Sequence, residues 1–338
     1  MLKVVILAEK FIGKANGVYT AVVETVENLK HRSDIALSVN DNLEKADIIH
    51  SHTIGIAYLL KSFGRKSKLI VSAHVVPDSF IGSLILSELW RPLAKWYLKW
   101  VYSRARVVVA VSPIVKKELE KIGVQSEIQV LCNSVNREKF KPDPALRSLF
   151  RNRFALGEND FIALCVGQIQ PRKGVSDFVE VAKRLPQVRF VWVGGRPYGR
   201  LTADYDRMTE LIQSAPKNVI FTGTAEFEEM PGYYAMADIY FFPSFQENFA
   251  FATIEASSVH LPLVLRDNPE YPSTLFTHYL KAKTQDGFVQ QIQQLASDSV
   301  FFKKWREESN QLASEYDSRS YTQKLVDIYK KVYASASP

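Results

Sequence analysis

The sequence has few cysteines and no long hydrophobic run. Of its 338 residues only Cys132 and Cys165 are cysteine, and both lie in apolar, strand-like runs. A reduced cytoplasmic protein is the simple interpretation, and a bridge between the two thiols is the alternative. No apolar run reaches the roughly 18 residues of a membrane-spanning helix, and the N-terminal MLKVVILAEKF reads as a buried strand rather than a signal peptide.

Several motifs of nucleotide-binding proteins and hydrolases are also missing. The glycine spacing matches neither a P-loop nor a dinucleotide fingerprint, and there is no nucleophile elbow or Ser/His/Asp order of a hydrolase. Tandem repeats and low-complexity tracts are absent as well. With 46% hydrophobic and 23% charged residues, the chain is typical of a globular protein and long enough for two domains.

Acidic residues are scarce in the first half of the chain. Residues 1–150 hold 22 Lys and Arg against 14 Asp and Glu, whereas residues 151–338 hold 21 against 22. The net charge of +7 therefore comes from the first half. A basic half points to an anionic partner (a membrane surface, a nucleic acid or a phosphorylated substrate), and plain solubility is the alternative. No nucleic-acid motif is present, so we expect no nucleic-acid partner.

Short apolar runs alternate with helical patterns throughout. Runs such as KLIVSAH and FIALCVGQ are continuously apolar, as in parallel strands covered on both faces. The pattern predicts an α/β protein of two doubly wound, Rossmann-like domains. We expect the domains at residues 1–150 and 151–317, joined through a polar linker at 133–160. Residues 318–338 form a final amphipathic helix.

Two glutamates and a lysine form the main candidate site. Glu247 follows the apolar run IYFFPS, and Glu255 falls in the first turns of the next helix. Lys173 lies between another apolar run and a helix, where backbone N–H groups attract anions. The carboxyl ends of strands are where open α/β sheets bind ligands. Lys173 could bind phosphates, and the two glutamates could bind hydroxyl groups, which suits a phosphate-linked sugar as ligand. The alternative is that these residues are ordinary solvated surface charges.

Glycines and histidines mark strand ends in the first half. Gly13 and Gly17 lie between the first strand and the first helix, where Gly17 lets the backbone approach a ligand closely or serves as a routine turn residue.

His50, His52 and His74 end the second and third apolar runs. His74 is a candidate hydrogen-bonding group or general base, and for the other two a structural and a functional role remain open. We do not expect zinc, since no regular ligand set is completed.

Residues 84–102 predict an amphipathic helix that starts near Pro92, an allowed first-turn residue. One side carries the basic residues Arg91, Lys95 and Lys99. Another side carries Leu93, Trp96, Tyr97 and Trp100. Trp and Tyr favour the membrane–water interface and basic residues favour anionic lipid, which makes Arg91, Lys95, Trp96, Lys99 and Trp100 candidate membrane-binding residues. The alternative is a helix that buries its aromatic side chains in the core.

Together these motifs resemble the retaining family 4 glycosyltransferases of GT-B fold. The Glu-x7-Glu signature, PRKG after a glycine at a strand end, the loop NGV at 16–18 and the linker NSVNREKFKP occur in the family's order. The resemblance covers nearly the whole chain. It implies that the second domain binds a nucleotide sugar, and that the last helix crosses back to the first domain.

The resemblance also implies roles for individual residues. Lys173, helped by Arg172, binds the donor diphosphate, while Glu247 binds the sugar near O3 and Glu255 binds the ribose hydroxyls. Backbone N–H groups approach the phosphate and sugar at Asn248, Phe249 and Ala250. Gly17 supplies a backbone contact, and His74 is the candidate sugar-contacting histidine of the first domain. Stabilisation of the leaving diphosphate by these groups needs no divalent metal.

The chain departs from the family pattern at three places. Gln168 stands where many relatives have arginine, so Arg172 compensates or the diphosphate is held less tightly. The usual Glu-Gly-Phe-Gly is replaced by residues 247–250, Glu-Asn-Phe-Ala, which tolerate positive φ less well. Asn136 stands where aspartate is common. The lysine and both glutamates of the pattern, Lys173, Glu247 and Glu255, are retained.

A narrower resemblance concerns the acceptor. The segments HVVPDSFIGSLI, VGQIQPRKGVSDFVEVA and WVGGRPYG look like bacterial diglycosyl-diacylglycerol synthases, which glycosylate glucosyl-diacylglycerol. This implies UDP-glucose or UDP-galactose as donor, glucosyl-diacylglycerol as acceptor and anionic lipid on the inner face of the cell membrane as a partner. A family member with a soluble or protein acceptor, and a non-catalytic nucleotide-sugar-binding protein, are the alternatives.

Overall fold

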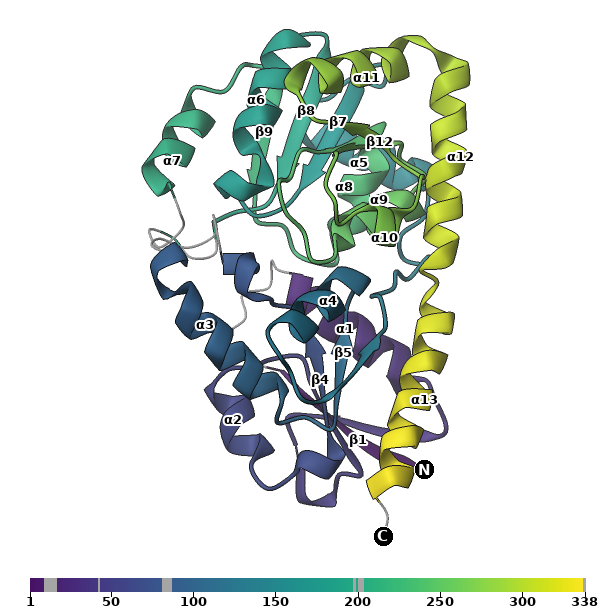
Figure 1. Cartoon of the computed structure of the whole chain (residues 1–338). Helices are drawn as coiled ribbons and strands as arrows, with labels where there is room; N and C mark the ends of the chain where they lie inside the picture. The colour runs from purple at the N-terminus through teal and green to yellow at the C-terminus, as the bar shows by residue number, and fades with distance from the viewer. Residues whose placement is uncertain (9–16, 42, 81–86, 197–198, 200–203, 337–338) are drawn as a thin grey trace. The chain divides into compact units, whose positions relative to one another are not determined.

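The computed structural model describes all residues except 9–16, 42, 81–86, 197–198, 200–203 and 337–338 (Figure 1). The chain divides into two compact units. Unit 1 comprises Met1–Phe80, Glu88–Ser134 and Tyr316–Pro338, and unit 2 comprises Ile81–Ser87 and Val135–Glu315. Each unit contains one parallel six-stranded sheet, and the predicted α/β class with two doubly wound domains is confirmed.

The sheet of unit 1 has the strand order β2-β1-β3-β4-β5-β6. Its strands are β1 (Leu2–Leu7), β2 (Ile35–Val39), β3 (Ile48–Ser51), β4 (Leu69–Ala73), β5 (Val107–Ala110) and β6 (Glu127–Val130). The helices of unit 1 are α1 (Gly17–Lys30), α2 (Ile56–Ser62), α3 (Ser87–Tyr102), α4 (Pro113–Lys121) and α13 (Ser318–Ala336), with short 3-10 turns η1 (Leu43–Lys45), η2 (Lys66–Lys68) and η3 (Pro77–Phe80). The inner strands β3, β4 and β5 are wholly buried, because helices cover both faces of the sheet.

The last helix, α13, belongs to the core of unit 1. Its residues Tyr321, Leu325, Tyr329 and Val332 repeat along one helical face and are buried among side chains of β1, β3, β4 and β5. Burial of each large side chain contributes roughly 1.5–3 kcal/mol. The C-terminal helix therefore completes the hydrophobic core of unit 1, which also contains the N-terminal strand β1.

The sheet of unit 2 has the order β12-β11-β10-β7-β8-β9. Its strands are β7 (Phe161–Val166), β8 (Val188–Val193), β9 (Val219–Gly223), β10 (Ile239–Phe242), β11 (Leu263–Arg266) and β12 (Leu280–Ala282). Its helices are α5 (Pro144–Arg153), α6 (Val175–Arg184), α7 (Tyr205–Gln213), α8 (Met230–Met236), α9 (Phe251–Ser258), α10 (Pro272–Leu275), α11 (Gln285–Ser297) and α12 (Ser299–Glu315), with the turn η4 at Pro171–Lys173.

The strand order of unit 2 reverses between β7 and β10. From β7 the chain runs outward through β8 and β9, and it then returns to β10 on the other side of β7. The loops after β7 and β10 therefore leave neighbouring strands at the carboxyl edge of the sheet, at the switch point where open α/β sheets bind ligands, which we call the crevice. Lys173 follows β7 and Glu247 follows β10, so the topology alone brings them to one place.

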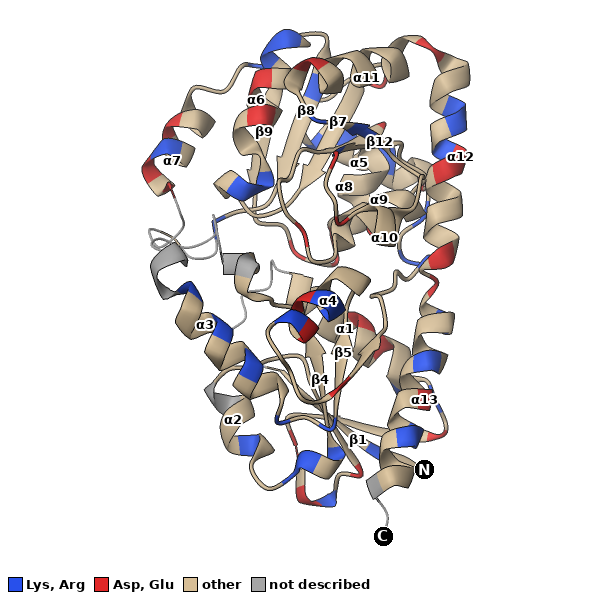
Figure 2. Ribbon diagram, viewed as in Figure 1, with Lys and Arg blue, Asp and Glu red and all other residues tan. Residues whose placement is uncertain are grey.

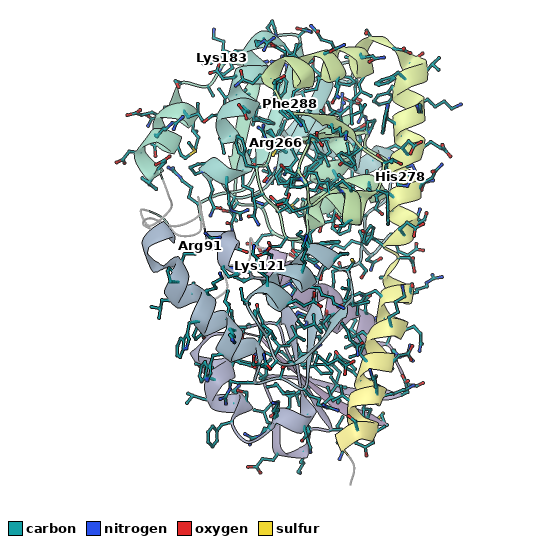
Figure 3. All side chains as sticks on the ribbon, viewed as in Figure 1. Arg91, Lys121, Lys183, Arg266, His278 and Phe288 are labelled. Atoms are coloured by element: carbon teal, nitrogen blue, oxygen red, sulfur yellow. The ribbon has the colours of Figure 1, made fainter. Side chains whose placement is uncertain are left out.

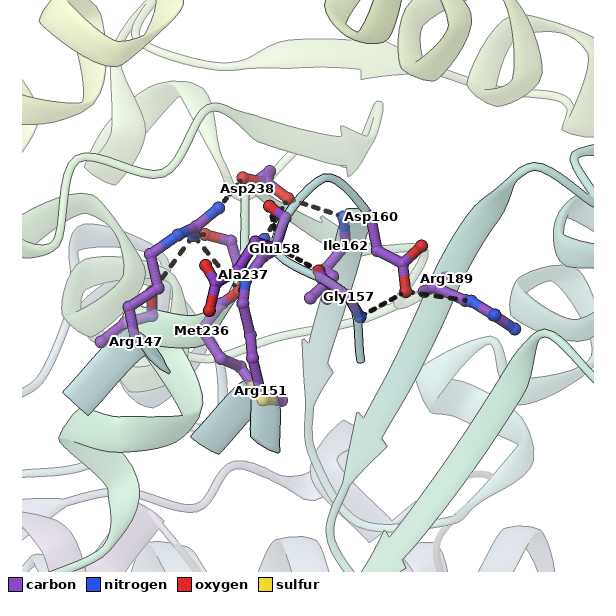
Figure 4. A network of polar contacts seen from close by, with 11 residues as sticks. Arg147, Arg151, Gly157, Glu158, Asp160, Ile162, Arg189, Met236, Ala237 and Asp238 are labelled. Carbon is purple, nitrogen blue, oxygen red and sulfur yellow. Dashed lines mark hydrogen bonds and ion pairs between the residues drawn. The ribbon is translucent and has the colours of Figure 1, made fainter. Parts of the chain in front are cut away.

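A buried arginine network fastens α5 into unit 2 (Figure 4). Arg151 is fully buried and donates to the carbonyl oxygens of Met236 (3.0 Å), Gly157 (2.7 Å) and Glu158 (2.8 Å) and to the Asp238 carboxylate (2.9 Å). Residues 135–150 thus pack with unit 2, whereas the sequence placed the domain boundary after residue 150.

Helix α3 begins earlier than expected. The sequence predicted a start near Pro92, but the helix starts at Ser87 and contains Pro92. Proline in a helix removes one backbone hydrogen bond and usually bends or ends it. Here the helix continues because its later residues Ala94, Leu98 and Val101 are buried against unit 1.

Candidate functional site

The loops after β7 and β10 are packed tightly against each other. Gly174, which ends η4, has φ of 76°, and a Cβ there would lie 2.3 Å from the carbonyl oxygen of Pro243. The backbone N–H of Phe245 donates to the carbonyl of Arg172 at 2.8 Å. Only glycine combines this conformation with this approach, so Gly174 lets the Lys173 turn reach the β10 loop.

Lys173 and Glu247 form a buried ion pair in this crevice. The Lys173 Nζ lies 2.5 Å from Glu247 Oε1, which also accepts a hydrogen bond from Ser244 Oγ at 2.6 Å. Arg172 donates to the carbonyl of Gln246 at 3.1 Å, and its guanidinium lies 3.9 Å from the same carboxylate oxygen. Burial lowers the pKa of Lys173 to about 8, although the Glu247 carboxylate opposes this shift. The structure therefore brings together the predicted residues Arg172, Lys173 and Glu247.

Arg266 holds the β10 loop in place, a role that sequence reasoning missed. Its guanidinium donates to the Pro243 carbonyl (2.9 Å), pairs with Asp177 of α6, and stacks over the Phe245 ring at 3.8 Å. Figure 3 labels Arg266 beside Phe288 of α11, whose ring centroid lies 5.5 Å from the guanidinium. The only sequence signal is an arginine at the end of the buried run LVLR, and its partners are far away in the chain.

Glu255 lies on α9, close after the Glu247 loop, and is buried. Its Oε2 accepts a hydrogen bond from the Tyr234 hydroxyl at 2.6 Å. Burial raises the pKa of Glu255 to about 7, and the bond from Tyr234 opposes the shift. Tyr234 is itself fully buried, with a pKa raised by burial, and so remains a hydrogen-bond donor.

The residues between the two glutamates adopt ordinary backbone conformations. Ala250, where the family pattern has glycine, has φ of −89° and precedes α9 without a side-chain cap. The Asn248 side chain accepts a hydrogen bond from Gln246 at 3.1 Å, and Phe249 contacts Phe251 edge to face. The replaced glycines thus cause no strain, and the first N–H groups of α9 are left uncapped by a side chain at the crevice.

A cavity of about 440 Å³ opens near the ends of β8 and β9. Its described lining comes from β9, from the loops after β7, β8 and β9, and from α7: Ile169, Gly194, Gly195, Arg196, Gly199, Tyr205, Ile212, Phe221, Gly223 and Thr224. The Arg196 guanidinium lies 4.3 Å from the Tyr205 ring centroid. Gly194 is required because a Cβ there would lie 2.0 Å from the Gly167 carbonyl oxygen. Sequence reasoning missed this cavity, which three separate loops form.

The three histidines of unit 1 gather at the ends of β3 and β4. His52 Nδ1 lies 3.1 Å from His74 Nε2, and the two rings stack. His50 is bonded to Tyr329 of α13 at 2.6 Å and to Ser72 at 2.8 Å, which makes it a structural residue. Burial lowers the pKa of His50 to about 3 and of His74 to about 4, and it also lowers that of His52, so all three are neutral at pH 7. His74 is half-buried and therefore remains a candidate contact.

Gly17 is the exposed first residue of α1. The other residues of the predicted loop, including Gly13 and Asn16, lie outside the described residues.

The predicted membrane-binding residues lie on the exposed side of α3. Trp96 and Trp100 are 62% and 41% exposed, and their rings are parallel with centroids 6.2 Å apart. Arg91, Lys95 and Lys99 are also exposed. The expectation of surface aromatic residues holds for both tryptophans, whereas Tyr97 is half-buried and donates to the Ile54 carbonyl. In the described part of the chain, no helix has the length and apolar character to cross a membrane.

Several solved structures share this architecture. The fold is similar to sucrose-phosphate synthase from Thermosynechococcus elongatus (TM-score 0.82, 15% identity, 99% of this chain and 100% of that one). It is also similar to Anabaena HepE in complex with UDP and glucose (TM-score 0.78, 16% identity, 98% and 100%). At these identities the likeness shows the fold alone, which is the GT-B fold.

Sequence comparisons show the family. The model for glycosyltransferase family 4 matches residues 26–139, and the model for glycosyl transferases group 1 matches residues 147–312. The chain is 32% identical to alpha-galactosylglucosyldiacylglycerol synthase of Streptococcus pneumoniae over 96% of this chain and 87% of the relative. It is 28% identical to processive diacylglycerol alpha-glucosyltransferase of Acholeplasma laidlawii over 75% and 76%. The chain belongs to the family 4 glycosyltransferases and is a glycosyltransferase.

Proposed function

We propose that this protein transfers a hexose from UDP-glucose or UDP-galactose to glucosyl-diacylglycerol at the surface of an anionic membrane. The observation that carries the proposal is the buried Lys173–Glu247 pair at the switch point of unit 2, with Glu255 on the following helix. The two relatives named above, which by their names act on diacylglycerol or its glycosides, support the acceptor.

The donor would be held by the charges of the crevice. Lys173 and Arg172 bind the diphosphate, and Lys173 exchanges its contact with Glu247 for one with phosphate. The released Glu247 carboxylate accepts hydrogen bonds from sugar hydroxyls, while Glu255 accepts one from the ribose. Backbone N–H groups at Asn248, Phe249 and Ala250, just before α9, would approach the phosphate and sugar. From unit 1, Gly17 and His74 would contact the donor or its sugar.

The chemistry follows from where charge develops. As the bond between sugar and diphosphate breaks, negative charge builds on the leaving oxygens, and the sugar becomes oxocarbenium-like. Lys173 and Arg172 stabilise that charge directly, and we propose that the reaction requires no divalent metal. The acceptor hydroxyl attacks from the face that the diphosphate leaves, which retains the configuration, and the leaving phosphate takes the acceptor proton.

Transfer of radiolabelled hexose tests the acceptor. Protein would be incubated with each UDP-sugar and with micelles of glucosyl-diacylglycerol containing anionic lipid, beside glucose 6-phosphate as a soluble acceptor. The proposal predicts labelled product in the organic phase, with one of the two donors preferred. Label confined to water-soluble products would reject the lipid acceptor and favour a family member that uses a soluble one.

The pH profile of kcat/KM for the UDP-sugar should be a narrow bell. Donor binding needs ionised Glu255 and protonated Lys173 in the free enzyme. With pKa values of about 7 and about 8, activity rises as Glu255 loses its proton and falls as Lys173 loses its own. Initial rates between pH 5.5 and 9.5, about 1.5 pH units beyond each pKa, measure it. A flat profile across this range would contradict both assignments.

Tyr234→Phe should move the acid limb of this bell to higher pH. The substitution removes the 2.6 Å hydrogen bond that stabilises ionised Glu255, so a larger fraction of Glu255 is protonated at pH 7. The donor KM at pH 7 should rise, and high pH should restore it. Tyr233→Phe on the same helix is the control, because no bond joins that hydroxyl to Glu255 in the described structure. An unshifted limb in Tyr234→Phe would exclude a positioning role.

A further inference from the structure

The end of α2 exposes two large apolar side chains that no sequence motif indicated. Leu60 is 73% exposed, and Phe63, directly after the helix, is 75% exposed. Both are more exposed than Trp96 and Trp100 of α3. Tyr58 and Ser62 of the same helix are buried, so α2 is anchored on one side and presents Leu60 on the other.

The turn after α2 holds Phe63 in this exposed position. Phe63 has an extended backbone (φ −60°, ψ 131°), and Gly64 follows with φ of 71°. The Arg65 guanidinium folds back and donates to the carbonyls of Lys61 (3.3 Å) and Phe63 (3.2 Å). These bonds satisfy carbonyls at the helix end and stabilise the turn. Phe63 is therefore presented by an ordered turn.

The same segment is strongly basic. Lys61, Arg65, Lys66 and Lys68 fall within residues 61–68, and residues 48–77 contain no Asp or Glu. Lys68 is tied to the Ala46 carbonyl, whereas Lys66 is exposed. Figure 2 shows Lys and Arg around α2 and along α3. Each basic residue near an anionic lipid surface contributes about 1 kcal/mol to binding.

Two hydrogen bonds join the α2 segment to α3 within unit 1. The Tyr58 hydroxyl donates to the Val101 carbonyl at 3.2 Å, and the Tyr97 hydroxyl donates to the Ile54 carbonyl just before α2. Leu93, Trp96, Tyr97 and Trp100 are spaced three or four residues apart and therefore lie on one face of α3. Arg104 stacks over Trp100 at 5.1 Å and also influences the pKa of Tyr58. Tyr58 and Tyr97 thus hold the segment that carries Leu60 and Phe63 next to α3.

We propose that residues 60–66, from Leu60 to Lys66, form a second membrane-inserting element that docks beside α3 on an anionic bilayer. The inference rests on the proposed membrane-linked function. It adds a second contact with the membrane to the one predicted for α3. Leu60 and Phe63 enter the interfacial layer, and Lys61, Arg65 and Lys66 meet lipid headgroups. The proposed partner is an anionic bilayer. Its interfacial layer accepts the apolar side chains of Leu60 and Phe63, and its headgroups attract a basic segment that contains no Asp or Glu.

An environment-sensitive label tests insertion directly. An NBD fluorophore would be attached at Phe63→Cys in a Cys132→Ser background; the other cysteine, Cys165, is fully buried. With phosphatidylcholine vesicles containing phosphatidylglycerol, the emission should shift to the blue and gain intensity. The same label at Leu149→Cys, a 59% exposed position on α5 of unit 2, should not shift. An unshifted label at position 63 on vesicle-bound protein would overturn the inference.

Vesicle sedimentation separates this inference from the proposed function. Leu60→Ser/Phe63→Ser should weaken binding to the anionic vesicles about tenfold, and Leu149→Ser should leave it unchanged. If Trp96→Ser/Trp100→Ser releases the protein and the α2 variant binds as wild type, the inference fails while the membrane function stands. If the wild-type protein fails to bind these vesicles, both fail. Equal binding to purely zwitterionic vesicles would also overturn the proposed role of the basic residues.

Discussion

Lys173→Met should lower kcat for hexose transfer by about 10²–10³-fold, the usual effect of removing one group that stabilises a developing anion. Methionine keeps most of the aliphatic volume of this buried side chain and removes only the charge. The Glu247 carboxylate would lose its 2.5 Å partner and keep the bond from Ser244. Steady-state kinetics with saturating donor measure the effect, and calorimetry with UDP measures the accompanying loss of affinity.

Lys183→Met is the matched control for this prediction. Lys183 lies on α6 and pairs with Glu180 at 2.6 Å, but both side chains are exposed. Lys183→Met removes a lysine–glutamate ion pair whose N–O distance is similar to that of Lys173–Glu247, but it leaves the crevice unchanged. We therefore expect the wild-type kcat. Circular dichroism would establish that both variants are folded. A folded Lys173→Met protein with wild-type kcat would show that the lysine does not act on the leaving group.

Arg151→Met should reduce the free energy of unfolding by about 1.5–3 kcal/mol, because it removes a fully buried guanidinium that donates to the Asp238 carboxylate and to three backbone carbonyls. Arg151 joins α5 to the end of α8, to Asp238 at the start of β10 and to the loop before β7. These are the strands that carry the site. Urea unfolding followed by circular dichroism would measure the loss, with a lower midpoint expected.

Arg153→Met, two residues along the same helix, is the control for Arg151. Arg153 pairs with Glu229 at 2.7 Å, but this pair is exposed to solvent and should contribute nothing measurable. Equal unfolding midpoints for the two variants would mean that the network in Figure 4 does not stabilise unit 2.

The strands and the position of the main site could be predicted because their signals are local. Continuous apolar runs identify parallel strands without knowledge of their partners. Lys173 and Glu247 each follow such a run, and the rule that ligands bind at carboxyl ends of strands brought them together. Their ion pair joins the segments that follow two adjacent strands of the observed sheet, β7 and β10.

What could not be predicted depends on contacts between distant residues. Arg266 supports the site through Asp177 and Pro243, and Tyr234 reaches Glu255 from another helix. No spacing rule connects such pairs, because the chain between them folds into whole strands and helices. The start of α3 was also misjudged, since tertiary burial beyond Pro92 outweighed the local preference of proline for a first turn.

The account is tested most directly by the initial rate of labelled diglycosyl-diacylglycerol formation in Glu247→Ala compared with the wild type. Both proteins would be assayed with UDP-hexose and glucosyl-diacylglycerol micelles at equal folded concentration. The wild type should form the labelled lipid, and Glu247→Ala should fall to the background rate, because it removes the sugar-binding carboxylate and unpairs Lys173. Wild-type rates in folded Glu247→Ala would contradict the assignment of this crevice as the transfer site.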